Sequence, residues 1–211
     1  MFIRFVRFAC LPALLALFVM AAGSRIAPAQ TEWLDALRQG GYVIVFRHGA
    51  THPDQADTDP FNLDNVDKQR QLNDAGRAKA REVGEAFRKL GIPVARVHTS
   101  MFNRAVETGK LMAVGEVTPT IDISEGGLIV SPNENQRRAQ AMRKLAATAP
   151  PAGSNVVLVT HRPNILDAFG KDLFDFREGE AALFKPDPEG RAKLVARVQA
   201  DDWAKLAQSA K

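Results

Sequence analysis

The apolar segment from Tyr42 to Phe46 constrains the fold of this chain more than any other feature. It follows Gly40-Gly41, and its Val-Ile-Val centre is apolar throughout rather than alternating with polar residues. A short β-branched run of this kind is typical of a strand that is buried on both faces of a parallel sheet. Arg47 and His48 then lie at the carboxyl end of the strand. Open α/β sheets bind their ligands at that edge, so both side chains are candidate site residues.

The rest of the chain alternates between expected helices and expected strands. Helices are predicted over 31–39, 73–90, 102–113, 133–147 and 163–170. Strands are predicted over 92–98, 120–123, 155–160, 181–185 and 193–199. The last two strands flank a segment rich in proline and glycine and are expected to form a hairpin. This alternation predicts an α/β fold, a three-layer α/β/α sandwich with a mostly parallel sheet and an antiparallel edge.

Two more strand ends carry polar side chains. Arg104 lies in the first turn of the helix that follows strand 92–98, and His161 comes directly after strand 155–160. Each of these residues alone could be an ordinary ion pair or a hydrogen-bonded strand end. Together with Arg47 and His48, they place two arginines and two histidines at one edge of the sheet. Phosphoryl transfer needs this combination of cationic donors and an in-line nucleophile.

The order of these segments resembles that of the histidine phosphatase superfamily, also called phosphoglycerate mutase-like. The resemblance covers nearly all of the chain after residue 30 and points to a small exported phosphatase. It rests on Arg-His-Gly-Ala-Thr at 47–51, Gln-Leu-Asn-Asp-Ala-Gly at 71–76, the segment 98–108 with its Ser-x-x-x-Arg-Ala-x-x-Thr pattern, and a strand that ends in Thr-His at 160–161.

The resemblance implies a role for each matching residue. His48 would attack phosphorus and become a phosphohistidine. Arg47 and Arg104 would bind phosphate oxygens, and His161 would donate a further hydrogen bond. Thr51 is a further candidate phosphate ligand, although its hydroxyl group, like that of Ser100, could equally cap a turn.

The general acid is the least certain position. The acid phosphatase branch of the superfamily has an aspartate directly after the second histidine, and this chain has Arg162 there. The mutase-like branch uses a glutamate downstream of the second arginine motif, and Glu125 fits that place. Glu180, Asp54 or a water molecule remain alternatives. The chain also has Ala50 where many relatives have glutamate.

Other polar residues have two interpretations each. Arg70 could add a cation to the phosphate pocket or be solvated, and the acidic residues of the loop 52–70 are expected to be solvated. His48 and His52 are four residues apart, and with His161 they could form a zinc site. The pair follows a strand rather than lying within a helix, so this spacing need not bring both rings to one side. We expect neither a metal ion nor another cofactor.

The first 29 residues resemble a secretory signal peptide. Arg4 and Arg7 give a basic start, residues 8–23 are almost wholly apolar, and Ala27-Pro28-Ala29 has the small-x-small pattern of a cleavage site. The apolar run is shorter than the roughly 20 residues of a membrane span. We predict a signal peptide at 1–29 and a phosphatase domain at 30–211, with an uncleaved membrane anchor as the alternative. The one cysteine, Cys10, lies in the predicted signal, so thiol chemistry is not expected.

The charge balance argues against a nucleic-acid partner. The chain has 28 basic and 24 acidic residues, and residues 1–29 hold three arginines and no acid, so 28 − 3 = 25 basic residues remain against 24 acidic ones. We therefore predict a periplasmic or secreted phosphatase that acts on a small-molecule or envelope phosphomonoester. The alternatives are a phosphatase specific for lipid or polysaccharide phosphate, and a phosphate-binding pseudoenzyme of the same fold.

Overall fold

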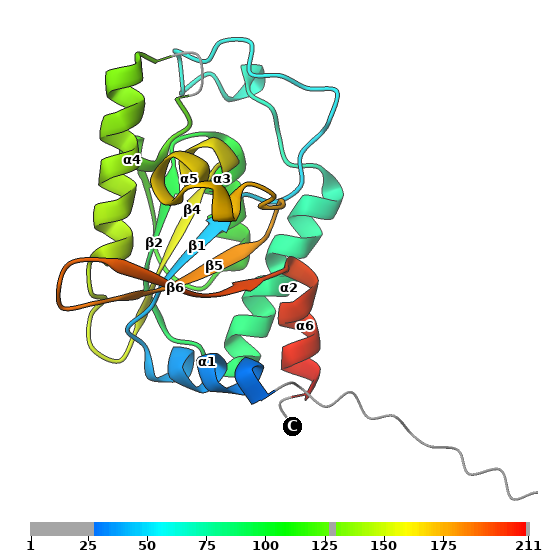
Figure 1. The fold of residues 1–211 in the computed structure, drawn as a ribbon. Coiled ribbons are helices and arrows are strands. Elements are labelled where there is room, and N and C mark those ends of the chain that lie inside the picture. Colours follow the sequence, from blue (N-terminus) through cyan, green and yellow to red (C-terminus); the bar gives the residue numbers. More distant parts are fainter. Residues whose placement is uncertain (1–27, 127–129, 210–211) are drawn as a thin grey trace, which may run out of the picture.

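A computed structural model describes residues 28–126 and 130–209, and their strands form one six-stranded sheet (Figure 1). The strand order is β3-β2-β4-β1-β5-β6. Strands β3, β2, β4 and β1 are parallel, whereas β5 runs antiparallel to β1 and β6. The bounds are β1 Val43–Arg47, β2 Val94–Ser100, β3 Val117–Thr120, β4 Asn155–Thr160, β5 Ala181–Pro186 and β6 Ala192–Val198. The predicted α/β fold, mostly parallel with an antiparallel edge, is confirmed.

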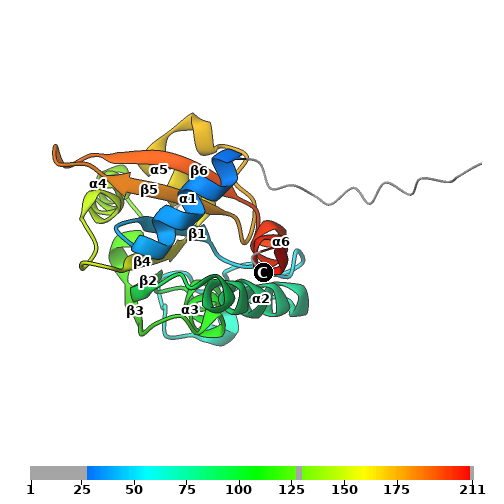
Figure 2. The same ribbon diagram turned by 90° about the horizontal axis from the view of Figure 1, so that it is seen from below.

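Helices cover both faces of this sheet (Figure 2). Helices α1, α2, α3 and α6 contribute to the core on one face, and α4 and α5 contribute to the core on the other. Their bounds are α1 Pro28–Gln39, α2 Asp74–Leu90, α3 Asn103–Met112, α4 Pro132–Ala147, α5 Arg162–Phe169 and α6 Ala200–Ser209. Short 3-10 helices lie at η1 Val66–Lys68, η2 Ile121–Ile123 and η3 Lys171–Leu173.

Strand β1 shows why its sequence is apolar throughout. Ile44 and Phe46 belong to the core under α1, α2, α3 and α6, whereas Val43 and Val45 belong to the core under α4 and α5. Successive side chains of a strand point to opposite faces, and here both faces are buried. The strand therefore lies in the middle of the molecule and delivers Arg47 and His48 to one edge of the sheet.

Helix α2 begins and ends as its sequence predicts. Asn73 caps it by accepting a hydrogen bond from the backbone N–H of Gly76 at 2.8 Å, and Gly91 ends it in the left-handed conformation with φ 68°. Gly76 also lies against the backbone of Ala50, because a Cβ there would collide with the carbonyl oxygen of Ala50. A glycine is thus required where the helix packs against the loop that carries His48.

The structure corrects two expectations about the elements and adds a helix that was not expected. The strand predicted at 120–123 is instead β3 at Val117–Thr120, and η2 follows it. Pro119 lies within this edge strand, paired with Thr99, at a place where sheets tolerate proline. Strand β2 lies two residues later than predicted. Helix α6, which buries Trp203 and Leu206, was not predicted at all.

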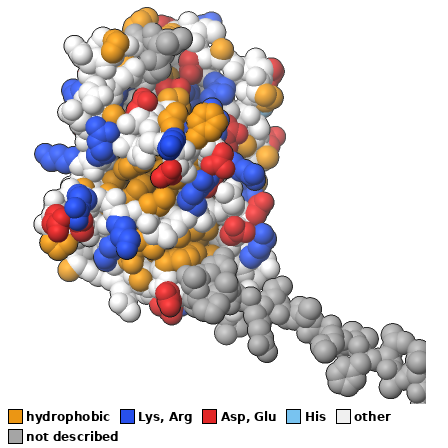
Figure 3. Space-filling model, viewed as in Figure 1, with side chains coloured by type: hydrophobic (Ala, Val, Ile, Leu, Met, Phe, Trp, Pro, Cys, Tyr) orange, Lys and Arg blue, Asp and Glu red, His pale blue; other side chains and the backbone are white. Residues whose placement is uncertain are grey.

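The predicted signal peptide lies almost wholly outside the described residues. Helix α1 begins at Pro28, three residues earlier than predicted, so the expected cleavage point after Ala29 falls in its first turn. Cleavage remains a prediction. Among the helices of residues 28–126 and 130–209, none is long and apolar enough to cross a membrane. On the face shown in Figure 3, basic and acidic side chains are interspersed rather than gathered in one basic patch.

Candidate active site

The sheet brings the two predicted histidines side by side. His48 follows β1 and His161 follows β4, and these strands are neighbours in which Arg47 pairs with Thr160. The centroids of the two imidazole rings are 5.1 Å apart. Arg104, in the first turn of α3, has its charge close enough to lower the pKa of both rings. The predicted cluster at the carboxyl edge of the sheet is therefore present.

His48 is held in the form that a nucleophile requires. Its side chain is buried, and its Nδ1 lies 2.8 Å from the carbonyl oxygen of Gly49. Because a carbonyl oxygen can only accept, Nδ1 carries the proton, and Nε2 has a free lone pair. Burial lowers the pKa of His48 well below its usual value, and the charge of Arg104 lowers it further. The imidazole is therefore neutral at neutral pH.

His161 is oriented by Ser100. Its Nε2 lies 2.7 Å from Ser100 Oγ, and this oxygen also accepts a hydrogen bond from the backbone N–H of Phe102 at 3.1 Å. Among the described residues the ring nitrogen is the acceptor in reach of the serine hydroxyl, so Ser100 donates to Nε2 and the ring proton is on Nδ1. Burial lowers the pKa of His161 well below its usual value, followed by the charges of Arg104 and His48. A neutral His161 can thus donate from Nδ1.

Arg104 is fully buried between two carboxylates. Its Nη1 lies 2.9 Å from Asp57 Oδ1, and its Nη2 lies 2.9 Å from Glu125 Oε2. The guanidinium also lies 4.5 Å above the centroid of the Phe102 ring. A buried cation needs such compensation, since removal from water is costly. Asp57, which was expected to be merely solvated, instead orients this arginine.

Glu125, the predicted general acid, lies beside both Arg104 and His161. Its Oε2 contacts Arg104 and also lies 3.3 Å from Nδ1 of His161. The second contact lacks hydrogen-bond geometry, so the N–H of His161 stays without a partner. The carboxyl group is about one-quarter exposed, and so water can reach it. A proton could therefore pass between Glu125 and a leaving group at this edge.

Arg47 and Thr51 share a partner that the sequence did not reveal. Glu178 Oε1 accepts hydrogen bonds from Arg47 Nη2 at 3.3 Å and from the Thr51 hydroxyl at 3.0 Å. Arg47 Nη1 also donates to the carbonyl oxygen of Phe176 at 3.0 Å. The hydroxyl group of Thr51, a predicted phosphate ligand, thus donates its hydrogen bond to Glu178. No motif marks Glu178, because its role depends on contacts with residues about 130 positions earlier.

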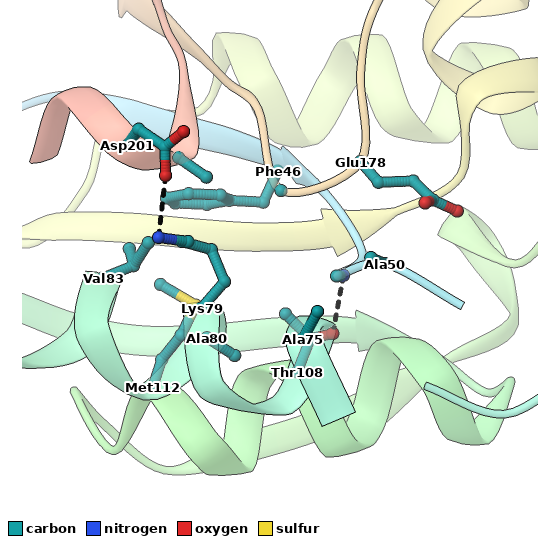
Figure 4. Close-up of a pocket in the computed structure, with 13 residues that line it drawn as sticks. Phe46, Ala50, Ala75, Lys79, Ala80, Val83, Thr108, Met112, Glu178 and Asp201 are labelled. Atoms are coloured by element: carbon teal, nitrogen blue, oxygen red, sulfur yellow. Dashed lines mark hydrogen bonds and ion pairs between the residues drawn. The ribbon is translucent and has the colours of Figure 1, made fainter. Parts of the chain in front are cut away.

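Backbone hydrogen bonds also fix the loop that follows β1. The N–H of Gly49 donates to Thr108 Oγ1 at 3.0 Å (Figure 4). The Thr108 hydroxyl in turn donates to the carbonyl oxygen of Arg104 at 2.7 Å. The N–H of Gly179 donates to the carbonyl oxygens of Arg47 and His48 at 3.2 and 2.9 Å. The backbone around the nucleophile is therefore fixed by α3 on one side and by the segment before β5 on the other.

Three unsatisfied donors mark this edge as a place for an anion. Within the described residues, six buried side-chain polar atoms have no hydrogen-bond partner. Three of them are Arg47 Nε, Arg104 Nε and His161 Nδ1. Buried polar groups are nearly always paired, and each orphan needs an explanation. Three N–H donors on the residues around His48 are explained by a ligand with several acceptor oxygens.

The other candidate residues lie elsewhere or have other partners. Glu180 is fully buried, and its carboxylate accepts from Arg197 Nε at 2.7 Å and from the N–H of Arg177 at 2.8 Å. Glu180 therefore forms a buried ion pair with Arg197 and is not available as the general acid. Asp54 is exposed on its loop, and Arg162 is exposed with its guanidinium 5.6 Å above the Phe174 ring.

Arg70 belongs to the surroundings of the site. Its backbone N–H donates to Asp57 Oδ1 at 2.9 Å. The charge of its guanidinium also helps to lower the pKa of His48 and of His161. The interpretation as an extra cation is thus favoured over that of a solvated loop residue. In the described part of the chain, no group of three His, Cys, Asp or Glu side chains is arranged to hold a metal ion.

Comparison with known families agrees with this geometry. The sequence model of the histidine phosphatase superfamily, branch 1, matches residues 43–126, which include Arg47, His48, Arg104 and Glu125. The segment 43–126 of the chain is thus similar to the histidine phosphatase superfamily. The family and the enzyme class predicted from the sequence, a histidine phosphatase, are confirmed by this match. His161 lies beyond the matched segment, and it is the sheet that places it beside His48.

Solved structures share the fold of this histidine phosphatase. The protein histidine phosphatase SixA in complex with tungstate is 18% identical, covering 76% of this chain and 98% of its own, with a TM-score of 0.51. The SixA structure from Agrobacterium tumefaciens is also 18% identical, with coverages of 75% and 97% and a TM-score of 0.50. A phosphoserine phosphatase from Entamoeba histolytica in complex with phosphoserine is 15% identical, with coverages of 75% and 97% and a TM-score of 0.51. No curated protein matches the sequence.

Proposed function

We propose that this histidine phosphatase is an exported enzyme that hydrolyses phosphomonoesters through a phosphohistidine on His48, without a metal ion. The observation that carries the proposal is the set of three buried, unpartnered N–H donors around a neutral His48 whose Nε2 is free. The equatorial oxygens of a transferring phosphoryl group need such donors. Arg47 and Arg104 supply the positive charge that the reaction requires.

The reaction proceeds in two displacements. Nε2 of His48 attacks phosphorus, the bond between phosphorus and the ester oxygen breaks, and Glu125 gives its proton to the leaving oxygen. A water molecule then attacks the phosphohistidine and gives its proton to Glu125, the bond between phosphorus and Nε2 breaks, and phosphate leaves. A bound phosphate competes with Glu125 for Nη2 of Arg104. This competition releases the carboxyl group for its role as acid.

The first test is turnover of p-nitrophenyl phosphate by the purified protein in EDTA, beside the variants His48→Ala and His98→Ala. His98 is a half-buried histidine in β2 away from the site, and so it is a matched control. We expect turnover by the parent and by His98→Ala, and none by His48→Ala. We also expect an acid-labile phosphorylated form that needs His48. Activity that EDTA removes, or that survives in His48→Ala, would contradict the mechanism.

A phosphate-binding pseudoenzyme is the second candidate. Arg162 stands in place of one branch's acid, and the remaining candidate, Glu125, is ion-paired with Arg104 in the absence of substrate. Phosphate binding by the parent without turnover of p-nitrophenyl phosphate at any pH between about 4 and 8 would favour this function.

The proposed location and substrate follow from the predicted signal peptide. We infer that the enzyme is periplasmic or secreted and acts on an extracytoplasmic phosphomonoester, either a small molecule or a phosphate group of envelope lipid or polysaccharide. Mass spectrometry of the protein recovered from its producing cell tests export. An N-terminus at Gln30 is expected, whereas a retained residue 1 would support the anchored alternative.

A further inference from the structure

The backbone that carries the general-acid candidate is fixed just before that residue. Ser124, which precedes Glu125, is fully buried. Its N–H donates to the carbonyl oxygen of Ile121 at 3.0 Å, and its hydroxyl donates to that of Thr120 at 2.8 Å. Its carbonyl oxygen accepts from two side chains that come from other elements. All three polar groups of the residue before the acid are therefore hydrogen-bonded.

One of the two side chains is Arg138 of helix α4. Its Nη1 donates to the carbonyl oxygen of Ser124 at 3.1 Å and to that of Glu125 itself at 3.2 Å. The other side chain is Asn164 of α5, whose Nδ2 lies 2.9 Å from the carbonyl oxygen of Ser124. Arg138 is 7% exposed, and its Nε donates to Glu134 Oε1 at 2.8 Å, one turn earlier in α4. This ion pair orients the guanidinium toward the backbone of the acid.

The buried guanidinium is not needed to neutralise Glu134. That carboxylate also accepts two hydrogen bonds from Arg137, at 2.8 and 2.9 Å. Burial of a guanidinium is costly unless its N–H groups are hydrogen-bonded. Here two of the hydrogen bonds that compensate for burial go to the segment that carries Glu125.

The backbone contacts matter most when substrate is bound. Without substrate, Oε2 of Glu125 lies 2.9 Å from Nη2 of Arg104. In the proposed mechanism the phosphoryl group takes this N–H, so the carboxyl group loses its charged partner when it has to face the leaving oxygen. The position of the carboxyl group then depends on the backbone of residues 124–125. A displacement of about 1 Å from the productive geometry can lower a rate by about 10²-fold.

We propose that Arg138 is a positioning residue for the general acid. Its hydrogen bonds to the carbonyl oxygens of Ser124 and Glu125 keep the carboxyl group at the leaving oxygen once Arg104 binds the phosphoryl group. Arg138 itself does not touch the substrate in this role. The inference rests on the proposed function, in which Glu125 is the acid.

The test is the dependence of kcat/KM on the leaving group, measured on the full-length protein with ethyl phosphate and with p-nitrophenyl phosphate. Ethoxide has to be protonated as it leaves, whereas p-nitrophenolate leaves unprotonated. Arg138→Met keeps a long side chain and removes the N–H donors, and Glu134 retains Arg137 as its partner. We expect kcat/KM to fall by about 10- to 100-fold for ethyl phosphate and by less than about threefold for p-nitrophenyl phosphate.

Arg143→Met is the matched control. Arg143 lies in the same helix, and its Nη1 also donates to two carbonyl oxygens, those of Asp167 and Ala168 at 3.1 and 3.2 Å. These oxygens belong to α5 and not to the segment that carries the acid. The ratio of the two kcat/KM values should therefore stay at the parent's value in Arg143→Met. An equal fall for both substrates in Arg138→Met would show a merely structural role and would overturn the inference.

The double variant Glu125→Gln, Arg138→Met tests whether Arg138 acts through Glu125. With the acid already absent, loss of Arg138 should slow ethyl phosphate hydrolysis no further than Glu125→Gln alone does. Losses that multiply would overturn the inference. Where Arg138→Met fails to fold, Glu134→Ala decides, because it removes from the surface of α4 the carboxylate that orients Arg138. A selective loss on ethyl phosphate is expected there too, and an unchanged ratio would overturn the inference.

Glu125→Gln alone distinguishes failure of this inference from failure of the proposed function. If it slows ethyl phosphate selectively and Arg138→Met does not, Glu125 is the acid and only the role of Arg138 is refuted. If Glu125→Gln shows no selectivity, or the parent turns over neither substrate, the proposed acid is refuted together with the role of Arg138.

Discussion

At the scale of single residues, Glu125 is the described carboxylate that contacts both Arg104 and His161. We expect Glu125→Gln to lower kcat for an alkyl phosphate by about 10²- to 10⁴-fold, because an alkoxide cannot leave without a proton. Turnover of p-nitrophenyl phosphate should fall far less, since p-nitrophenolate leaves unprotonated. Steady-state kinetics on the two substrates measures the difference.

The control for this variant is Asp57→Asn. Asp57 is the other carboxylate partner of Arg104, but among the described contacts it is Glu125, and not Asp57, that also lies beside His161. Loss of Asp57 should therefore lower turnover of the two substrates to the same extent. If Glu125→Gln also affected both substrates equally, Glu125 would be a positioning residue for Arg104, and the acid would have to come from water or from another group.

The two buried histidines predict how stability depends on pH. Burial lowers the pKa of His48 and of His161 well below 6.5 in the folded state. Below pH 6.5 the unfolded chain therefore binds more protons than the folded one, and stability falls as the pH decreases. The maximal slope is about 1.4 kcal/mol per pH unit for each histidine. Urea denaturation at several pH values between about 4.5 and 7.5 measures it.

The double variant His48→Gln, His161→Gln separates this effect from general acid denaturation. It lacks both groups and should lose most of the slope between pH 6.5 and pH 5, where carboxylates contribute less. An equal slope in the parent and in the variant would show that the two rings are not the source. The same lowered pKa of His48 predicts that kcat/KM is maintained below pH 6.5, because Nε2 stays unprotonated there.

At the scale of elements, helix α2 supports the nucleophile loop through one glycine and packs on α3 through another. A Cβ on Gly76 would collide with the backbone of Ala50, and a Cβ on Gly84 would collide with the carbonyl oxygen of Met112. Gly76→Ala and Gly84→Ala should each cost about 1–3 kcal/mol of stability, the usual cost of overpacking. Only Gly76→Ala should also lower kcat, since only its neighbour belongs to the loop of His48.

Thermal unfolding and kinetics at a temperature well below both transitions test this pair. The two variants act as controls for one another, because both lie in the same helix and both add one methyl group. A loss of kcat in Gly84→Ala as large as in Gly76→Ala would mean that α2 transmits any displacement to the site. The local contact with Ala50 would then not be the cause.

At the scale of the whole molecule, α6 closes one face of the core although it comes last in the chain. The Trp203 ring is fully buried and lies 4.7 Å from Phe87, 5.8 Å from Trp33 and 6.4 Å from Phe46 between centroids. Trp203→Ala should destabilise the protein by about 3–5 kcal/mol. Calorimetry measures the loss, and Phe61→Ala, at a residue that is 81% exposed, should cost almost nothing. If Trp203→Ala and Phe61→Ala lowered the stability by similar amounts, α6 would not be part of the cooperative core.

The sequence by itself determined the sheet and the four residues at its edge. Runs such as Tyr42 to Phe46 are apolar on both faces only when helices cover both faces, so the parallel sheet follows from local pattern. Parallel strands end at a common edge, and this brings His48 and His161 together although they are 113 positions apart in the sequence. Asn73 and Gly91 likewise set the ends of α2 through local hydrogen bonds and backbone conformation.

Only the tertiary structure showed which carboxylates contact Arg47 and Arg104. Glu125 was expected from the family resemblance, whereas Asp57 and Glu178 come from segments without helical or strand periodicity and are recognised only by their contacts with Arg104 and Arg47. The position of β3 and the packing of α6 also depended on neighbours rather than on propensity. Such contacts join residues far apart in the chain, and their energies come from burial of charge and apolar surface. Both exist only once the sheet and its helices have assembled.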